Sequence, residues 1–299
     1  MRIFITGATG FIGSAITEEL ISAGHQVIGL ARSDAAAKSL IDAGAQVHRG
    51  DVEDLESLRS GAAMSDGVIH TAFIHEFSKY QANCEIDRRA IEALGVVLAG
   101  SHRPLIVTSG TGVMGLMPGR PGTEEDAPVP SSAMPRSASE EAVASVSARG
   151  VHTVVVRLPP SVHDPDKQGL IMPMIELARE KRVSAYVDNG LNRWPAVHRL
   201  DAAHLFCLAL EKGSAGARYH GVAEEGVTLR EIADVIGRRL NVPVVAKSPE
   251  EAAAHFGWLG FFVGVDCPAS SALTQERLGW RRTKEGLIAD LEQARNLEI

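Results

Sequence analysis

The chain has 299 residues, 45% of them hydrophobic, so it can bury a substantial core as one large domain or as one domain with a smaller lobe. Its net charge of −7 comes from interspersed acidic and basic residues, which excludes the basic surface of a nucleic-acid-binding protein. No apolar run is as long as a membrane span, and the sequence opens on a strand-like segment without a charged and apolar leader. The three cysteines (Cys84, Cys207, Cys267) form no CxxC pair, and the histidines show no HExxH spacing. We therefore expect a soluble, cytoplasmic protein without a metal centre.

Short segments rich in β-branched residues alternate with helical patterns along the first half of the chain. The predicted strands are residues 2–6, 26–31, 45–49, 67–72, 104–109 and 152–158. Between the first two, Ile12, Ile16 and Leu20 recur every four residues with Ile21 beside them, which predicts an amphipathic helix that ends at Gly24. This alternation predicts an α/β fold of the Rossmann type, a doubly wound parallel sheet wrapped by helices.

The segment 131–150, SSAMPRSASEEAVASVSARG, predicts a loop that leads into a helix. Pro135 suits a first helical turn, and Ala138, Ala142 and Val146 recur four residues apart, which is enough for one buried stripe.

Beyond residue 160 the pattern is looser. It predicts a loop at 159–169, helices near 170–182 and 201–212, and a strand at 217–223. A further helix begins at Thr228, with Glu231 three residues later as the partner in a capping box. The aromatic run that follows is lobe core, a contact in a homodimer, or the lining of a pocket for an apolar substrate; it comprises Phe256, Trp258, Leu259, Phe261 and Phe262.

The stretch TGATGFIG, residues 6–13, follows the first strand and opens the first helix. Gly7 permits a tight turn, Gly10 lets the backbone approach a pyrophosphate, and Gly13 allows the helix to pack closely on the strand. The unpaired N–H groups and the positive end of the helix dipole then face the phosphates. The sequence predicts a dinucleotide site whose first contacts are Thr6, Gly7, Thr9, Gly10, Phe11, Ile12 and Gly13.

The end of the second strand, GLARSD, indicates which dinucleotide binds. Ala31 stands where a carboxylate would bond the ribose of NAD, and Arg32 and Ser33 follow it. An arginine can fork onto the 2′-phosphate, so we predict NADP(H) rather than NAD(H); the alternative is a solvated strand-end arginine. Asp51 and Val52, in GDVED, are expected near the adenine, although a plain turn is an equal alternative.

Taken in order, TGxxGxxG, ARS, GDV, DGVIHTAF and a serine in the fifth strand resemble the short-chain dehydrogenase/reductase superfamily. VVRLPPSVHD, PAVHRLDAAHL and LTQERLGW are similar to motifs of its extended, NAD-dependent epimerase/dehydratase-like branch. The resemblance implies a dinucleotide on the sheet, a substrate under a second lobe, and reductase, epimerase or dehydratase activity. It implies further cofactor contacts from Thr71, Ala72, Phe73 and Pro159. His198 and Asp201 are similar to a structural hallmark and are left out of catalysis.

With this resemblance, we expect two parts. Residues 1–162 and 196–221 form the NADP-binding domain, and residues 163–195 and 222–299 form the substrate-binding lobe.

The superfamily's catalytic pair, Tyr-x-x-x-Lys, is missing. In that pair a phenol exchanges the carbonyl proton, while an ammonium lowers its pKa and holds the nicotinamide ribose. Residues 81–166 contain neither tyrosine nor lysine. In one alignment of 131–150, Arg136 replaces the tyrosine and Glu140 the lysine; in another, Ser132 and Arg136 take those places.

Several other side chains could supply the proton or orient the carbonyl. At the superfamily's upstream hydroxyl position stands Gly110, flanked by Ser109 and Thr111, which are either orienting groups or plain turn residues. The remaining candidates are His75 and Tyr80 after the fourth strand, His163 after the sixth, and Arg136. Each has a structural alternative, as a packing or surface residue.

These features together predict an NADPH-dependent reductase of a small carbonyl compound with a non-standard active site. One alternative is a protein that senses NADP(H) through partners and has lost turnover. Another is an epimerase or dehydratase of the sugar-nucleotide type, with a tightly held cofactor. The expected partner is a small-molecule substrate, which can be apolar, and neither nucleic acid nor a membrane.

Overall fold

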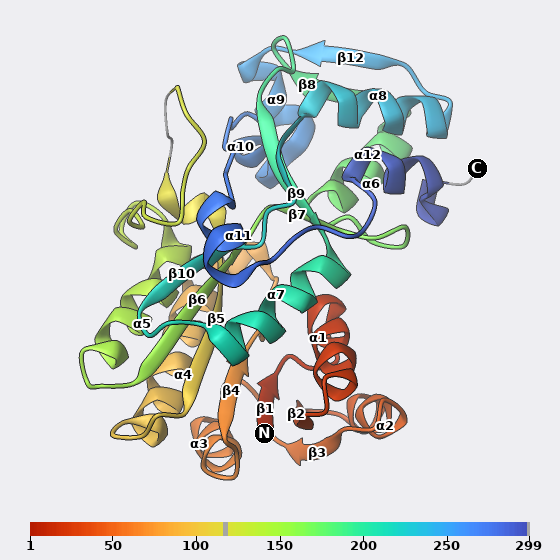
Figure 1. The fold of residues 1–299 in the computed structure, drawn as a ribbon. Coiled ribbons are helices and arrows are strands. Elements are labelled where there is room, and N and C mark those ends of the chain that lie inside the picture. The colour runs from red at the N-terminus through yellow and green to blue at the C-terminus, as the bar shows by residue number, and fades with distance from the viewer. Residues whose placement is uncertain (116–118, 298–299) are drawn as a thin grey trace.

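The structure, a computed structural model, describes residues 1–115 and 119–297, apart from the side chain of Phe261. Its centre is a seven-stranded parallel sheet in the order β10-β6-β5-β4-β1-β2-β3 (Figure 1). The strands are β1 (Arg2–Thr6), β2 (Gln26–Ala31), β3 (Gln46–Arg49), β4 (Gly67–His70), β5 (Pro104–Gly110), β6 (His152–Leu158) and β10 (Ala217–His220). The strand order reverses between β1 and β4, and at such a point the carboxyl ends of the strands open a crevice for a ligand. The predicted Rossmann-type fold is confirmed.

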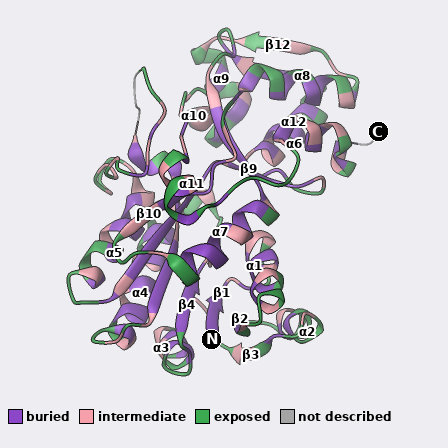
Figure 2. Cartoon of the chain, in the orientation of Figure 1, coloured by how far each residue is buried: buried purple, intermediate pink, exposed green. Residues whose placement is uncertain are grey.

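Helices cover both faces of this sheet. One face carries α1 (Phe11–Ser22), α2 (Asp34–Asp42) and α7 (Arg199–Lys212), and the other carries α3 (Leu55–Ala63), α4 (Tyr80–Leu98) and α5 (Ala138–Ser147). Alternation along the strands separates the two cores, because Ile3 and Ile5 pack with the first set of helices and Phe4 with the second. In Figure 2 the central strands are accordingly buried, while the outer sides of the helices are exposed.

The predicted elements of this sheet are found with small shifts at their ends. The strands at 2–6, 26–31 and 152–158 have the expected ends. The fourth strand ends at His70 rather than residue 72, because the Thr71 hydroxyl donates to the Thr6 carbonyl (2.7 Å) and the chain turns away. In segment 131–150 a 3₁₀ turn, η3 (Pro135–Ser137), leads into α5, whose buried stripe includes Ala138, Ala142 and Val146 as predicted.

A second lobe lies over the carboxyl ends of the strands (Figure 1). Its strands form two small sheets, β11-β9-β7 and β12-β8. The strands are β7 (Ser161–His163), β8 (Ser184–Val187), β9 (Arg193–His198), β11 (Glu224–Thr228) and β12 (Val244–Lys247). The helices of this lobe are α6 (Ile171–Lys181), α8 (Leu229–Leu240), α9 (Pro249–Phe256), α10 (Gly260–Val263) and α12 (Leu287–Gln293). Between the last two, α11 (Ala272–Leu278) packs against α7 and β10 of the large sheet. Short 3₁₀ turns are η1 (Phe77–Lys79), η2 (Thr111–Met114), η4 (Gly257–Leu259) and η5 (Arg295–Leu297).

Two predictions for this second half need correction. The segment 159–169 is not wholly a loop, because β7 lies within it and pairs in parallel with β9. That pairing depends on a partner strand distant in sequence, which local patterns do not reveal. The strand predicted at 217–223 ends at His220.

The predicted capping box at the start of α8 is confirmed, since the Thr228 hydroxyl oxygen accepts from the Glu231 N–H at 3.2 Å.

The carboxy-terminal segment contributes to both parts of the molecule. A lobe core includes Trp194, Ile236 and Leu291, whereas Trp280 packs in the sheet core beside α7 and donates its indole N–H to the Asp201 carbonyl (2.9 Å).

In the parts of the chain that the structure describes, none of the helices is both long and apolar enough to cross a membrane.

Candidate functional site

A cavity of about 1180 Å³ lies where the strands of the large sheet end, under the second lobe. Its lining includes the glycine turn after β1, the ends of β2 and β5, the segment after β4, and residues of the second lobe. This is the crevice that the strand order creates, and its volume suits a dinucleotide together with a second small molecule.

The glycine turn fits a pyrophosphate. Gly7 has φ +73°, which favours glycine, and a Cβ there would lie 2.8 Å from the Ala72 nitrogen. A Cβ on Gly13 would lie 2.0 Å from the Gly7 carbonyl oxygen, so α1 packs on the turn only without a side chain there. No side chain caps α1 at Gly10, which leaves the N–H groups of its first turn for a ligand.

Most of the residues predicted to contact a dinucleotide line this cavity. They are Gly7, Thr9, Gly10, Phe11, Ile12, Gly13, Arg32, Ser33, Asp51, Val52, Thr71, Ala72, Phe73 and Pro159. Thr6 does not line it: it is fully buried, and its hydroxyl bonds the ring nitrogen Nδ1 of His70 (2.7 Å) and accepts from the Ala72 N–H (3.3 Å). Thr6 therefore stabilises the end of β1 beside the glycine turn and does not contact a ligand in the cavity.

Arg32 is the exposed cation at the end of β2. No hydrogen bond or ion pair joins it to any other residue that the structure describes, whereas Ser33 caps α2 by accepting from the Ala36 N–H (3.2 Å). The Asp51 carboxylate accepts from the Glu53 N–H (3.0 Å) and so also shapes its own turn. The guanidinium of Arg32 is thus free to meet an anion at this edge of the cavity.

Arg136 is held in place inside the site. Its guanidinium donates to Asp87 Oδ2 (2.7 Å), to the Thr108 carbonyl (2.8 Å) and to the Ser139 hydroxyl, and it lies 4.5 Å from the centre of the Phe73 ring. With 15% of its side chain exposed, Arg136 is a fixed cation on the cavity wall and not a free charge at a helix start.

Asp87, on α4, was missed by the sequence analysis and anchors this arrangement. It is buried and also bonds His70 Nε2 (2.9 Å), so a polar chain runs from Thr6 through His70 and Asp87 to Arg136. Burial raises the pKa of the Asp87 carboxyl, but the charge of Arg136 and the bonds from His70 and Ser139 outweigh it and hold the pKa below its usual range. The one sequence signal for Asp87 is that a carboxylate falls on the buried face of the helix that becomes α4.

Glu140 points away from the cavity. Both of its oxygens accept from Arg157, at 2.7 and 2.8 Å, and one also meets Arg218 at 3.1 Å. Burial raises its pKa, but the bonds and charge of Arg157, with contributions from Ser109 and Arg218, hold it below the usual value. Ser132, the other candidate from the alignments, is exposed and outside the cavity lining. Neither alignment therefore restores the superfamily's pair.

Two proton donors face the cavity beside Arg136. Tyr80 begins α4, and burial raises the pKa of its phenol to about 12, with Cys84 adding to the rise and Arg136 opposing it. His75 lines the cavity and is exposed to solvent. Partial desolvation, followed by the charge of Arg136, lowers the pKa of its imidazole. At neutral pH both side chains are therefore uncharged, and Tyr80 carries its proton.

The other predicted catalytic candidates lie in different surroundings. Ser109 lines the cavity at the end of β5, but Thr111 is buried in η2 and lies outside the lining. His163 is fully buried, and its Nδ1 lies 2.6 Å from Asp290 of α12. The expectation that His163 reaches the reacting groups is corrected, because β7 turns its side chain into the second lobe.

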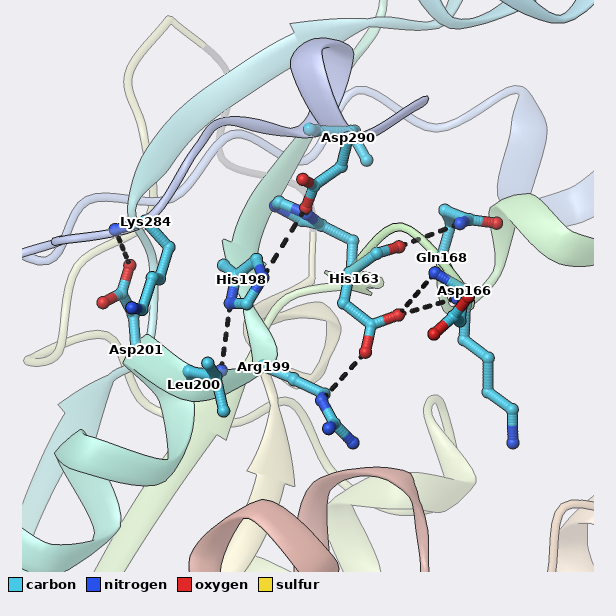
Figure 3. A network of polar contacts seen from close by, with 12 residues as sticks. His163, Asp166, Gln168, His198, Arg199, Leu200, Asp201, Lys284 and Asp290 are labelled. Atoms are coloured by element: carbon cyan, nitrogen blue, oxygen red, sulfur yellow. Dashed lines mark hydrogen bonds and ion pairs between the residues drawn. The ribbon is translucent and has the colours of Figure 1, made fainter. Parts of the chain in front are cut away.

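Figure 3 shows what His163 does instead. Asp290 lies between His163 and His198, with His198 Nε2 at 3.8 Å, and so ties α12 to β7 and β9. Close by, Arg199 pairs with Asp164 (2.8 Å) and donates to the carbonyl of Phe11 (3.2 Å) at the start of α1. Through these contacts Arg199 links Asp164, which follows β7 of the second lobe, to the start of α1 beside the glycine turn.

In the part of the chain that the structure describes, one group of three side chains could hold a metal ion. Ligand atoms of His25, Cys207 and Glu211 lie within 4.8 Å of one another, between the end of α1 and α7. Burial raises the pKa of the Cys207 thiol to about 12, and His25 is paired with Glu211 at 3.1 Å. The group lies outside the cavity lining, and the absence of a metal centre stays a prediction.

Comparisons with known proteins agree with this architecture. The chain is 52% identical over 291 residues to an uncharacterized protein of Schizosaccharomyces pombe, covering 97% of this chain and 98% of that one. It is 28% identical to the 4-hydroxy-2-methyl-3-oxo-4-farnesyl-3,4-dihydroquinoline-1-oxide ketoreductase of Stigmatella aurantiaca, over 86% of this chain and 80% of the relative. In fold it is similar to the dTDP-glucose 4,6-dehydratase DesIV of Streptomyces venezuelae, with a TM-score of 0.78, 19% identity, and coverage of 98% and 95% of the two chains. The model of the NAD dependent epimerase/dehydratase family matches residues 3–222, and the chain belongs to that family.

Proposed function

We propose that this protein is an NADPH-dependent reductase of a carbonyl compound, in which Tyr80 and Arg136 replace the superfamily's tyrosine and lysine. The observation that carries the proposal is their placement, because a neutral phenol and a fixed guanidinium line the same cavity as the dinucleotide turn. The ketoreductase relative supports a reductase activity.

The chain's own groups suffice to handle the proton. A bound nicotinamide supplies the hydride. As the carbonyl carbon gains that hydride, the carbonyl oxygen takes the proton of Tyr80 Oη, and the product is an alcohol with a phenolate left on Tyr80. Arg136 lies within electrostatic reach of Tyr80, so its charge stabilises both the developing oxyanion and the phenolate. Water then restores the phenol proton.

Two neighbours assist these groups. Ser109 can orient the carbonyl from the end of β5, and neutral His75 offers a second hydrogen bond at the cavity rim. The polar chain from Thr6 to Arg136 fixes the cation relative to the glycine turn, so cofactor and oxyanion site share one rigid frame.

Selectivity for NADPH forms part of the proposal. Ala31 leaves no carboxylate at the end of β2 to bond an NAD ribose, and the unpaired guanidinium of Arg32 suits a 2′-phosphate.

The proposal is tested by following NADPH oxidation by the wild-type protein across a panel of aldehydes and ketones, and then by its Tyr80→Phe variant. We expect Tyr80→Phe to lower kcat by about 10²- to 10⁴-fold, the contribution of a positioned proton donor. Tyr186→Phe, at a tyrosine outside the cavity lining, is the matched control and should be unchanged. Because the pKa of Tyr80 is about 12, kcat should not fall with rising pH until the pH nears that value.

Three outcomes would contradict the proposal. Binding of NADPH without oxidation by any carbonyl compound would favour a sensing protein, and nicotinamide that stays bound through purification would favour an epimerase or dehydratase. Full activity of Tyr80→Phe would remove Tyr80 as the donor.

A further inference from the structure

The substrate end of the cavity is apolar on the side of the second lobe. Leu170, Met172, Phe262 and Val265 line it there, and Lys167 is the one charged side chain that the lobe contributes from its described residues. Lys167 lies toward the cofactor end, with its ammonium 5.8 Å from the centre of the Phe11 ring. The lobe therefore offers a ligand mainly apolar surface.

Aromatic rings from both lobes form one surface here, which we call the aromatic wall: Phe73, Phe77, Tyr80 and Phe262. All four line the cavity. Tyr80 lies 6.2 Å from Phe73 and 5.7 Å from Phe77, and Phe77 lies 6.4 Å from Phe262, as measured between ring centres. These separations fall in the range at which aromatic rings attract one another.

Trp258 packs against two residues of the aromatic wall, Phe77 and Phe262. Its ring stacks on Phe77 at 4.4 Å and 11°, and it lies 6.1 Å from Phe262, although it does not line the cavity itself. Because Phe77 follows β4 and Trp258 belongs to η4, the stack joins the two lobes across the substrate end. Trp258 itself remains 48% exposed.

Charge at this end is confined to one place. Arg136 lies over Phe73, and the one acidic residue among the described cavity-lining residues, Asp51, stands at the adenine side. A sugar diphosphate would need several cations and many hydrogen-bonding groups, which an aromatic wall cannot supply. A flat apolar ring meets such a wall without leaving polar groups unpaired.

We propose that the substrate is an aromatic carbonyl compound, whose ring packs on the aromatic wall while its carbonyl oxygen meets Tyr80 and Arg136. This rests on the proposed function, because the same two residues handle the proton. A favourable pair of aromatic rings contributes about 0.5–1.5 kcal/mol beyond buried area, which is about 2- to 12-fold in affinity.

Binding of unreactive analogues tests the substrate class apart from turnover. The full-length protein loaded with NADP⁺ is titrated calorimetrically with benzamide and with cyclohexanecarboxamide, which have similar size and the same carbonyl group. We expect benzamide to bind about 2- to 12-fold more tightly. Phe262→Leu should bring the ratio of the two Kd values toward one while changing the affinity for cyclohexanecarboxamide little. Leu191→Ala, at an exposed leucine of the same lobe outside the lining, should leave the ratio unchanged.

The outcomes separate the two proposals. Equal Kd values in the wild type, a ratio insensitive to Phe262→Leu, or tighter binding of UDP-glucose than of benzamide would overturn the aromatic substrate. Reduction of aliphatic ketones with no preference for benzamide would overturn it and leave the reductase standing. Preference for benzamide without reduction of benzaldehyde or acetophenone would support the aromatic site and overturn the reductase.

Discussion

At the scale of single residues, the proposed function assigns the choice of dinucleotide to Arg32 and the source of the proton to Tyr80. Arg32 could be placed from the sequence because the end of a strand after a glycine turn is a fixed point of this architecture. Tyr80 and Arg136 could be named as candidates, but their meeting in one cavity depends on how α4 and α5 pack, which no local pattern shows.

Arg32→Ala should weaken the binding of NADPH far more than the binding of NADH, because it removes a charge-assisted hydrogen bond to the 2′-phosphate. Such a bond contributes about 1.5–3 kcal/mol, which is about 10- to 150-fold in Kd. Titration of each nucleotide by fluorescence measures the effect. Arg49→Ala removes another exposed strand-end arginine, one that pairs with Asp34 at 2.5 Å, and should leave both affinities unchanged. Equal losses of NADPH and NADH on Arg32→Ala would undo the cofactor assignment.

Arg136 has a structural role and, in the proposed function, a chemical one, and a second substitution separates the two. Arg136→Met leaves the Asp87 carboxylate buried without its cation, which should cost about 3–5 kcal/mol of unfolding free energy in urea. Adding Asp87→Asn removes that unpaired charge and should recover much of the stability. If Arg136 stabilises the oxyanion, kcat stays low in the double variant; recovery of kcat together with stability would reduce Arg136 to a packing role.

The ion pair between Asp87 and Arg136 also makes the stability of the protein depend on pH in the acid range. The pKa of Asp87 is lower in the folded than in the unfolded protein, so its contribution to stability is complete above the unfolded value of about 3.9. It is lost as the pH falls through the folded pKa. The Asp87→Asn variant should therefore lose less stability than the wild type as the pH falls below about 3.9, as followed by urea unfolding at each pH. Equal losses in the two proteins would contradict the assignment.

At the scale of elements, strands and helices with their own periodicity were predictable, and pairings between distant segments were not. β6 has the predicted ends because seven residues in a row favour a buried strand. β7 and β9 pair across more than thirty residues, and neither the short β7 nor its register with β9 has a local signature. For the same reason the sequence placed His163 beside the sheet and could not show that Asp290 draws it into the lobe.

The glycine turn and α1 act as one element. Gly13→Ala would place a Cβ 2.0 Å from the Gly7 carbonyl oxygen. Because the backbone fixes the positions of both atoms, the helix must shift away from the turn. We expect a loss of about 1–3 kcal/mol in stability and of at least tenfold in NADPH affinity, measured by urea unfolding and by fluorescence titration. Gly264→Ala, where a Cβ meets its nearest atom at 3.7 Å, is the control and should change neither. Unaltered NADPH binding by Gly13→Ala would count against the turn as the pyrophosphate site.

At the scale of the whole molecule, the carboxy-terminal segment makes the two parts depend on each other. Trp280 is 1% exposed in the sheet core, although it lies in sequence between α10 and α12 of the second lobe. Trp280→Ala should cost about 3–5 kcal/mol in urea unfolding, whereas Trp258→Ala, at a tryptophan 48% exposed, should cost less than about 2 kcal/mol. Similar costs for both would contradict the packing of Trp280 in the sheet core.

By itself the sequence determined the fold, the dinucleotide turn and the departure from the Tyr-x-x-x-Lys pair, because these depend on periodicity, on glycines at fixed spacing and on residue types along a continuous stretch. The tertiary structure decided which of the candidate side chains line one cavity. Arg136 faces the cavity because Asp87 of α4 binds it, Glu140 turns away because Arg157 of β6 binds it, and Tyr80 reaches the same cavity from a different helix. Ionic partners distant in sequence fixed these orientations, and only the folded chain brings such partners together.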